Sequence, residues 1–286
     1  MSNTPLKTPL KWVGGKTQIL EKVLAHFPSS PPIAYYEPFL GGGSVLLAFL
    51  QHQPAYTGPI YAGDINPHVI NFFQTLQSSP QPLCAAVETL KAAYESAESK
   101  ETKEAFYYDC RTTFNAGTLD SINRAAHFLF LNKTCFRGLY RAGPRGFNVP
   151  YGNYANPAIY DPAHLHAIST LIQPVRFIHN SYSDLLKDIP PGCFIYMDPP
   201  YVPVAKDSFV SYNEGGFGHE EHKALFALAG QLVEQGCAIL MSNADAPMVR
   251  EAFPEPAYIL ETVECRRAIN SKKPGSKAME VLVWNN

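Results

Sequence analysis

The sequence has no closely spaced cysteines and no long hydrophobic run. No C-x-x-C pair occurs, so neither a disulfide scaffold nor a zinc site is predicted. No apolar stretch approaches the length of a membrane span, and the N-terminal MSNTPLKTPLKWVGGK lacks the apolar region of a signal peptide. We therefore expect a cytoplasmic protein without membrane contact. The six cysteines are Cys84, Cys110, Cys135, Cys193, Cys237 and Cys265.

A metal site is not expected from the histidines either. HEEH at residues 219–222 places two histidines three positions apart, whereas the zinc-protease motif requires a spacing of four. The solvated start of a helix is the simpler interpretation of this stretch.

Acidic residues are missing from two stretches. The formal net charge of −2 argues against a protein that coats nucleic acid without specificity. No Asp or Glu occurs from Ser121 to Tyr160, or in CRRAINSKKPGSKAM at residues 265–279. Such local basic patches suit a partner with phosphates that is bound on one side. Their basic residues are Arg124, Lys133, Arg137, Arg141, Arg145, Arg266, Arg267, Lys272, Lys273 and Lys277.

The 286 residues, 46% of them hydrophobic, suffice for one large or two modest globular domains. AYYEPFLGGGSVLLAFL indicates a strand, a glycine turn and a helix from Ser44, and GPIYAGDINPHVINFFQTLQ repeats this order with Asp64 at its strand end. This order predicts an α/β sheet. Helical and Gly, Pro and Asn-rich stretches follow before strand patterns resume. We expect a catalytic sheet domain of residues 1–80 and 172–286, with a mostly helical domain, residues 81–171, inserted in it.

FIYMDPPYVP, at residues 194–203, runs from a hydrophobic strand into Asp198. Pro199 and Pro200 have no N–H and a fixed φ, so a regular ladder ends there and the acid is held at a rigid strand end. An Asp-Pro pair alone often just starts a turn. The whole tetrapeptide after a buried strand is rarer.

The glycine turn and Asp64 predict a nucleoside site, because ligands of open α/β sheets bind beyond the carboxyl ends of the strands. Asp64 follows at about the 20-residue separation of an acid that binds a ribose. The dinucleotide motif fails, since Leu46 stands where Gly41 and Gly43 would require a third glycine. S-adenosylmethionine, which has an adenosyl group but no phosphates, fits this pattern.

WVGGKT at residues 12–17 permits a second interpretation, a phosphate-loop ATPase. That motif needs a glycine at position 10, where Leu10 stands, so this alternative ranks lower. A catalytically silent DNA-binding module is the third alternative, and the intact DPPY and glycine loop argue against it.

The DPPY motif suits attack by the exocyclic amine of a nucleobase, whose lone pair is delocalised into the ring. A carboxylate and a backbone carbonyl that accept from both N–H bonds would pull the nitrogen toward tetrahedral geometry. Tyr201 offers a face for stacking the base, which must first leave its duplex. The sequence therefore predicts a pocket for a flipped base that faces a sulfonium methyl group.

Seven motifs occur in the order found in the Dam-type, or D12-class, DNA adenine-N6 methyltransferases: PLKWVGGK, EPFLGGGSV, GDIN, LNKTCFRGLYR, FNVPYGNY, SYSD and DPPY. The sequence resembles that family from residue 6 to about 284. The resemblance implies a Rossmann-like S-adenosylmethionine-dependent methyltransferase sheet with an inserted, mostly helical DNA-recognition domain. It implies double-stranded DNA as the partner. An N4-cytosine methyltransferase stays open, although such enzymes commonly carry Ser in place of Asp198.

The resemblance also implies roles for individual residues. The catalytic residues would be Asp198, Pro199, Pro200 and Tyr201, with Asp198 touching both the cofactor amino group and the target amine. The cofactor-binding residues would be Trp12 and Lys16 near the methionine part, Glu37, Phe39, Gly41 and Gly43 at the glycine loop, Asp64 at the ribose, and Tyr182 and Asp184 at the adenine. Ordinary core packing is the alternative for Trp12, Phe39 and Tyr182.

FRGLYRAGPRGFNVPYGNY would read the target sequence, since a Leu and an Arg help to read GATC in this family. Leu139 and Arg141 stand at those positions, and an arginine can pair with O6 and N7 of guanine. Arg137 replaces a family Asn, Asn153 replaces an Arg, and the loop is one residue shorter. We expect GATC first, with related four-base sites and a cognate restriction endonuclease left open. The predicted DNA contacts are Arg137, Leu139, Arg141, Arg145, Asn153, Lys272 and Lys273.

Overall fold

The computed structural model describes residues 6–203, 217–266 and 277–285. Lys272 and Lys273, two of the predicted DNA contacts, lie outside the described residues. The chain divides into two compact units. The first unit comprises Met1–Lys16, Gly41–Pro54 and Asn66–His179, and the second comprises Thr17–Leu40, Ala55–Ile65 and Asn180–Asn286. The assignment of residues 81–171 to a recognition domain stays a prediction.

Within the second unit the strands of the main sheet have the order β2-β1-β6-β7-β9-β8. In the second unit β1 pairs in parallel with β2 and β6, and β7 continues the parallel set. β9 and β8 complete the sheet in antiparallel pairing. The predicted α/β sheet is thus confirmed. The strands are β1 (Tyr35–Glu37), β2 (Ile60–Asp64), β5 (Val175–His179), β6 (Phe194–Met197), β7 (Ala238–Ala244), β8 (Tyr258–Arg266) and β9 (Lys277–Asn285).

Every residue of β1 and β6 is buried. Burial on both faces is typical of parallel strands covered by helices, and it explains the continuous apolar run of FIYM. β6 ends at Met197, as the prolines after Asp198 predicted. The sequence analysis missed β8, whose apolar and polar residues are mixed as expected for a half-exposed strand near a sheet edge.

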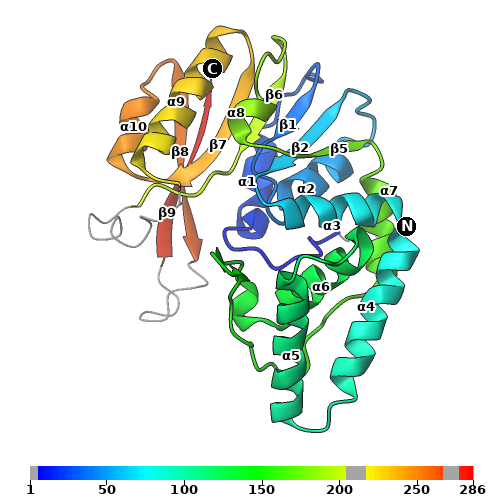
Figure 1. Cartoon of the computed structure of the whole chain (residues 1–286). Helices are drawn as coiled ribbons and strands as arrows, with labels where there is room; N and C mark the ends of the chain where they lie inside the picture. Colours follow the sequence, from blue (N-terminus) through cyan, green and yellow to red (C-terminus); the bar gives the residue numbers. More distant parts are fainter. Residues whose placement is uncertain (1–5, 204–216, 267–276, 286) are drawn as a thin grey trace. The chain divides into compact units, whose positions relative to one another are not determined.

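Helix α9 of the second unit packs on β7 (Figure 1). It begins at His219, as predicted, but the solvated interpretation of HEEH holds only for part of the motif. The side chain of His219 is 47% exposed, whereas His222 is 1% exposed because it lies on the buried face of the helix. The helices of this unit are α1 (Leu20–Ala25), α8 (Tyr182–Leu185), α9 (His219–Glu234) and α10 (Pro247–Ala252).

The first unit is mostly helical, and its helices α4, α5 and α6 pack against one another (Figure 1). Capping residues stabilise the N-termini of three helices. Ser99 forms a capping box with Thr102 at the start of α5, and the Asp120 and Asp161 carboxylates accept hydrogen bonds from backbone N–H groups at the starts of α6 and α7. The helices are α2 (Ser44–His52), α3 (Pro67–Ser78), α4 (Pro80–Glu95), α5 (Lys100–Asn115), α6 (Ser121–Thr134) and α7 (Pro162–Leu171). The predicted helix start at Ser44 is confirmed.

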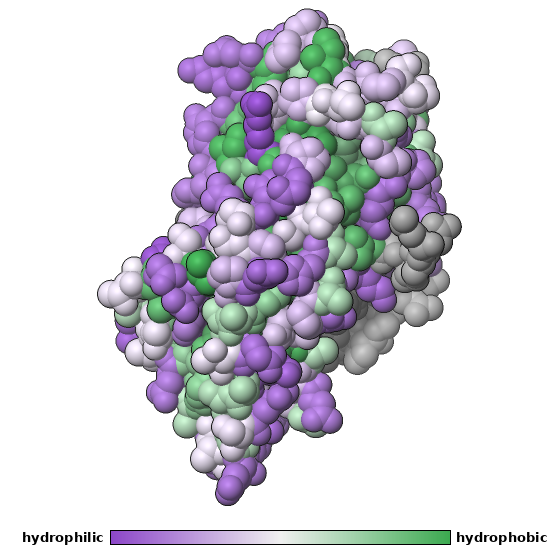
Figure 2. Space-filling view, turned by 90° about the vertical axis from the view of Figure 1, so that its right-hand side faces the viewer, coloured by the Kyte–Doolittle hydropathy of each residue, from purple (hydrophilic) through white to green (hydrophobic). Residues whose placement is uncertain are grey.

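Hydrophilic and hydrophobic residues are interspersed on the face shown in Figure 2. Among the described residues, no helix combines the length and the hydrophobicity needed to cross a bilayer. All six cysteines are buried, and none is part of a disulfide in the described ranges.

Candidate active site

Three acids stand at or just beyond the carboxyl ends of neighbouring parallel strands: Glu37 on β1, Asp64 on β2 and Asp198 after β6. Because β1 pairs in parallel with both of its neighbours, these ends meet at one edge of the sheet. The chain runs from β1 to β2 on one side and later returns to β6 on the other. β1 and β6 therefore flank the topological switch point, where open α/β sheets bind their ligands.

Glu37 is buried and accepts a hydrogen bond of 2.8 Å from the hydroxyl of Tyr35. Burial raises the pKa of Glu37 to about 8, although the Tyr35 hydrogen bond lowers it, and the charge of Asp198 raises it further. Glu37 is therefore mostly uncharged at pH 7. Because the charge of Asp198 affects this pKa, the two carboxyl groups interact electrostatically.

The backbone after Glu37 follows the end of β2, because Leu40 N–H donates to the carbonyl of Gly63 at 2.8 Å. Phe39 stacks on Tyr182 with 5.4 Å between ring centroids. Phe217, which the sequence analysis missed, contacts both rings at 6.0 and 5.9 Å. The structure thus brings Phe39 and Tyr182 together, and their contact with a cofactor stays a prediction.

Asp184 has a local structural role in the SYSD motif. Its backbone N–H donates to Ser181 Oγ at 3.1 Å, and that hydroxyl donates to Asp184 Oδ2 at 2.6 Å. These bonds cap the four-residue helix α8. The contact of Asp184 with a cofactor adenine stays a prediction.

The DPPY turn is held by two residues that the motifs did not reveal. The hydroxyl of Tyr201 donates to Glu280 Oε2 at 2.9 Å, and the backbone N–H of Val202 donates to Asn243 Oδ1 at 3.0 Å. Asp198 itself is half-buried just beyond β6. Asn243 could have been found, because it lies near the end of the strand next to β6.

Trp12 explains the glycines of EPFLGGG within the first unit. A Cβ on Gly41 would lie 2.6 Å from the indole nitrogen of Trp12, and one on Gly42 would lie 2.9 Å from its Cβ. Gly41 and Gly43 also have φ angles of +49° and +73°. The ring of Trp12 therefore requires glycine there, and the contact of Trp12, Gly41 and Gly43 with a cofactor stays a prediction.

Lys16 is buried and is not a residue of the protein surface. It is 3% exposed, and its ammonium group donates to the carbonyl of Gly14. Lys16 begins a single 3-10 turn, η1 (Lys16–Gln18), and α1 begins only at Leu20. This geometry differs from a phosphate loop, in which the helix follows the lysine directly. The contact of Lys16 with a cofactor stays a prediction.

The predicted target-reading segment contains the 3-10 turn η2 (Phe136–Gly138) and the hairpin of β3 (Ala142–Gly143) and β4 (Gly146–Phe147). Arg141 is exposed and donates its Nε–H to Asn148 Oδ1 at 2.6 Å. Arg145 is exposed in the hairpin turn. The exposed Arg137 and Asn153 have positive φ angles of 57° and 52°, which Asn tolerates better than Arg.

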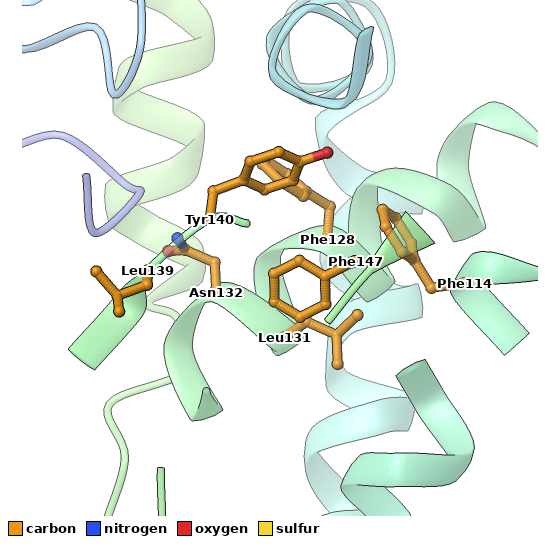
Figure 3. A pocket seen from close by; sticks show the side chains of 7 residues that line it. All are labelled: Phe114, Phe128, Leu131, Asn132, Leu139, Tyr140 and Phe147. Atoms are coloured by element: carbon orange, nitrogen blue, oxygen red, sulfur yellow. The ribbon is translucent and has the colours of Figure 1, made fainter. Parts of the chain in front are cut away.

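Asparagine side chains and aromatic rings hold this segment and Lys11 against the helices of the first unit. Asn115 exchanges two hydrogen bonds of 2.8 Å with the backbone of Phe147, and Asn132 does the same with Lys11 at 2.8 and 2.7 Å. Tyr140 also stacks on Trp12 at 5.9 Å. Sequence reasoning gave neither asparagine a role, although Asn132 lies in the LNKTCFRGLYR motif. Figure 3 shows the small pocket beneath the segment, lined by Phe114, Phe128, Leu131, Asn132, Leu139, Tyr140 and Phe147.

Three carboxyl groups at the switch point of a mostly parallel sheet, with a DPPY turn after β6, agree with the methyltransferase sheet that the sequence motifs predicted. The model of the D12 class N6 adenine-specific DNA methyltransferases matches residues 12–269, and the chain belongs to this family. Its members are S-adenosylmethionine-dependent DNA adenine methyltransferases. The alternatives of an N4-cytosine enzyme, an ATPase and a silent DNA-binding module are thereby set aside.

Curated relatives match over nearly the whole chain. The type II methyltransferase M.MjaIII of Methanocaldococcus jannaschii is 34% identical, across 98% of this chain and 99% of that protein. The DNA adenine methylase of Escherichia coli K12 is 32% identical, across 96% and 93%. The solved structure of the rRNA methyltransferase aviRa from Streptomyces viridochromogenes covers 99% of this chain and 93% of its own, at 14% identity and a TM-score of 0.37. That structure carries no weight in the assignment.

Proposed function

We propose that this D12-class enzyme methylates a flipped adenine in a short duplex site, with Asp198 as the residue that activates the target amine. The observation that carries the proposal is the parallel pairing of β1 with β2 and β6. It gathers Asp64, Glu37 and Asp198 at one sheet edge, beside a turn that cannot extend the strand.

The residues at this edge suit S-adenosylmethionine, which has an adenosyl group and a positively charged sulfur. Asp64 is a half-buried carboxylate that can accept from ribose hydroxyls, and the apolar side chain next to it, Ile65, is 69% exposed. Phe39 and Tyr182 add aromatic surface in the same unit. Sequence reasoning missed Ile65. We assign Asp64 to the ribose, and Ile65, Phe39 and Tyr182 to the adenine of S-adenosylmethionine.

When bound, S-adenosylmethionine supplies a methyl group on a positively charged sulfur. The Asp198 carboxylate and the carbonyl of Pro199 each accept a hydrogen bond from one N–H of the adenine amine. These two hydrogen bonds raise the electron density at N6. Tyr201 supports the base in its extrahelical position. Glu37, which burial keeps mostly neutral, limits the negative charge beside Asp198 until a cationic ligand is present.

For the target sequence we propose GATC, from the family resemblance of Leu139 and Arg141. Arg141 supports a guanine contact, because Asn148 orients its guanidinium: the side-chain oxygen accepts from Nε at 2.6 Å and the backbone carbonyl from Nη2 at 3.4 Å. Nη1 and the second hydrogen of Nη2 are left to donate to O6 and N7. Arg137 and Asn153 are the residues that would shift the specificity to a related site. A cognate restriction endonuclease and a cytoplasmic location stay predictions.

The test is expression in a host without DNA methylation, followed by sequencing that detects modified bases. We expect N6-methyladenine in one short motif, and none with the Asp198→Ala variant. Digestion with endonucleases that cut only methylated or only unmethylated GATC then decides the motif. Adenine methylation elsewhere with GATC unmodified would disprove GATC while leaving the reaction intact, and methylated cytosine would contradict the role given to Asp198.

A further inference from the structure

We propose that Glu280 is a positioning residue for the reaction: it holds the hydroxyl of Tyr201 and thereby fixes the ring on which the target base stacks. This inference rests on the role proposed above for the DPPY turn. It goes beyond that role by naming a residue from the last strand of the chain, 79 positions away from Tyr201.

Pro199 and Pro200 carry no N–H, so neither of them can donate a backbone hydrogen bond that would hold the DPPY turn in place. Two contacts hold it from outside. Val202 N–H donates to Asn243 Oδ1 at 3.0 Å between residues that are 4% and 0% exposed, and the Tyr201 hydroxyl donates to Glu280 Oε2 at 2.9 Å. The first contact fixes the backbone after the turn, and the second fixes the tip of the ring.

Both partners come from paired strands of the sheet. β9 pairs antiparallel to β7, with Glu280 opposite Ala244 and Val281 opposite Asn243. β7 in turn pairs in parallel with β6, the strand that leads into Asp198. Side chains on such strands hold their partners more precisely than side chains on loops. The anchors of Tyr201 therefore belong to the same rigid sheet as the catalytic acid.

The protonation of Tyr201 agrees with its role as the donor. Burial raises its pKa well above the ordinary value, and the charges of Asp198 and Glu280 raise it further. A tyrosine has two rotatable side-chain bonds, so a hydrogen bond at the hydroxyl restricts the orientation of the ring. A ring that is already fixed lowers the free-energy cost of ordering the flipped base against it.

A double-mutant cycle tests the inference: Glu280→Val, Tyr201→Phe and both together, with kcat and KM measured for DNA and for S-adenosylmethionine. We expect each single change to lower kcat roughly tenfold or more, as for one lost hydrogen bond to a charged group. The double variant should be no slower than either single one, and the KM for S-adenosylmethionine should change little. Glu280→Gln keeps an acceptor and should retain most of the activity.

A base analogue that fluoresces when unstacked, 2-aminopurine at the target position, reports flipping directly and should show a smaller signal with Glu280→Val. Glu251→Ala, which removes an exposed carboxylate on α10, is the matched control and should behave as wild type. If Glu280→Val does not fold, Tyr201→Phe decides alone, because it removes only the hydroxyl.

Three results would overturn the inference: independent, multiplying losses in the cycle, an unchanged kcat in Tyr201→Phe, or a Glu280→Gln variant as slow as Glu280→Val. Asp198→Ala separates this failure from that of the proposed function. An inactive Asp198→Ala together with multiplying losses would reject Glu280 alone. An active Asp198→Ala would reject the proposed role of the whole turn.

Discussion

The hydroxyl of Tyr35 lies 2.8 Å from Glu37 Oε2, two positions further along the same strand. Residues two apart on a strand share one face of the sheet, and these two are 0% and 2% exposed. The pKa of Glu37 nevertheless rises to about 8, so burial outweighs the hydrogen bond.

This pair predicts a pH dependence of stability. Between the ordinary Glu pKa of 4.5 and about 8, folded Glu37 is protonated while unfolded Glu37 is ionised. The folded state then binds the extra proton, so the free energy of unfolding falls as the pH rises through this window, by up to about 1.4 kcal/mol per pH unit from this group. Glu37→Gln should flatten the dependence in urea unfolding without cofactor from pH 5 to 8.5. Parallel curves for the two proteins would contradict this.

Asp198→Ala should lower methyl transfer by at least about 100-fold, the size of effect seen when one preorganised transition-state contact is removed. The fold should survive, because Asp198 is half-buried just beyond a strand end. Transfer of a labelled methyl group to DNA measures the first effect, and thermal unfolding measures the second. A folded variant with wild-type turnover would disprove the role of Asp198.

Asp64→Ala should raise the KM for S-adenosylmethionine and leave kcat at saturation mostly unchanged. The reason is that a ribose contact contributes equally to the bound ground state and the transition state. Initial rates over a range of cofactor concentrations measure both constants. A loss confined to kcat would place Asp64 in the chemical step instead.

Arg141→Lys should reduce discrimination at one base pair by about 10- to 100-fold, because lysine lacks the two outer nitrogens of the guanidinium. Methylation of duplexes that differ by single base pairs measures this. The matched change is Lys272→Glu with Lys273→Glu, which should weaken binding evenly across sequences if these lysines meet phosphates. An equal loss of methylation on all duplexes for Arg141→Lys would instead assign Arg141 to a contact with the DNA backbone.

Activity should be insensitive to EDTA. A sulfonium needs no Lewis acid, because its leaving group is already a neutral thioether. Methyl transfer assayed with and without EDTA, after dialysis, checks this. Activity that is lost with the chelator and restored by a divalent metal would count against the mechanism.

Local sequence was sufficient for most elements of the fold. Proline and glycine act through their own backbone, so the end of β6 at Met197 and the turn before Ser44 follow from the residues themselves. Strand β8 escaped detection, because its pairing with β9 depends on a partner that its own residues do not reveal. The burial of His222 was missed for the same reason.

By itself the sequence determined the order of most strands and helices, the break at DPPY and, through its ordered motifs, the methyltransferase family. Only the tertiary structure decided that Glu37 is mostly neutral, that Trp12 packs on Gly41, and that Glu280 holds Tyr201. These properties arise from burial and from contacts between residues far apart in the chain. Their free energies depend on which distant groups the fold brings together, and no local pattern specifies that.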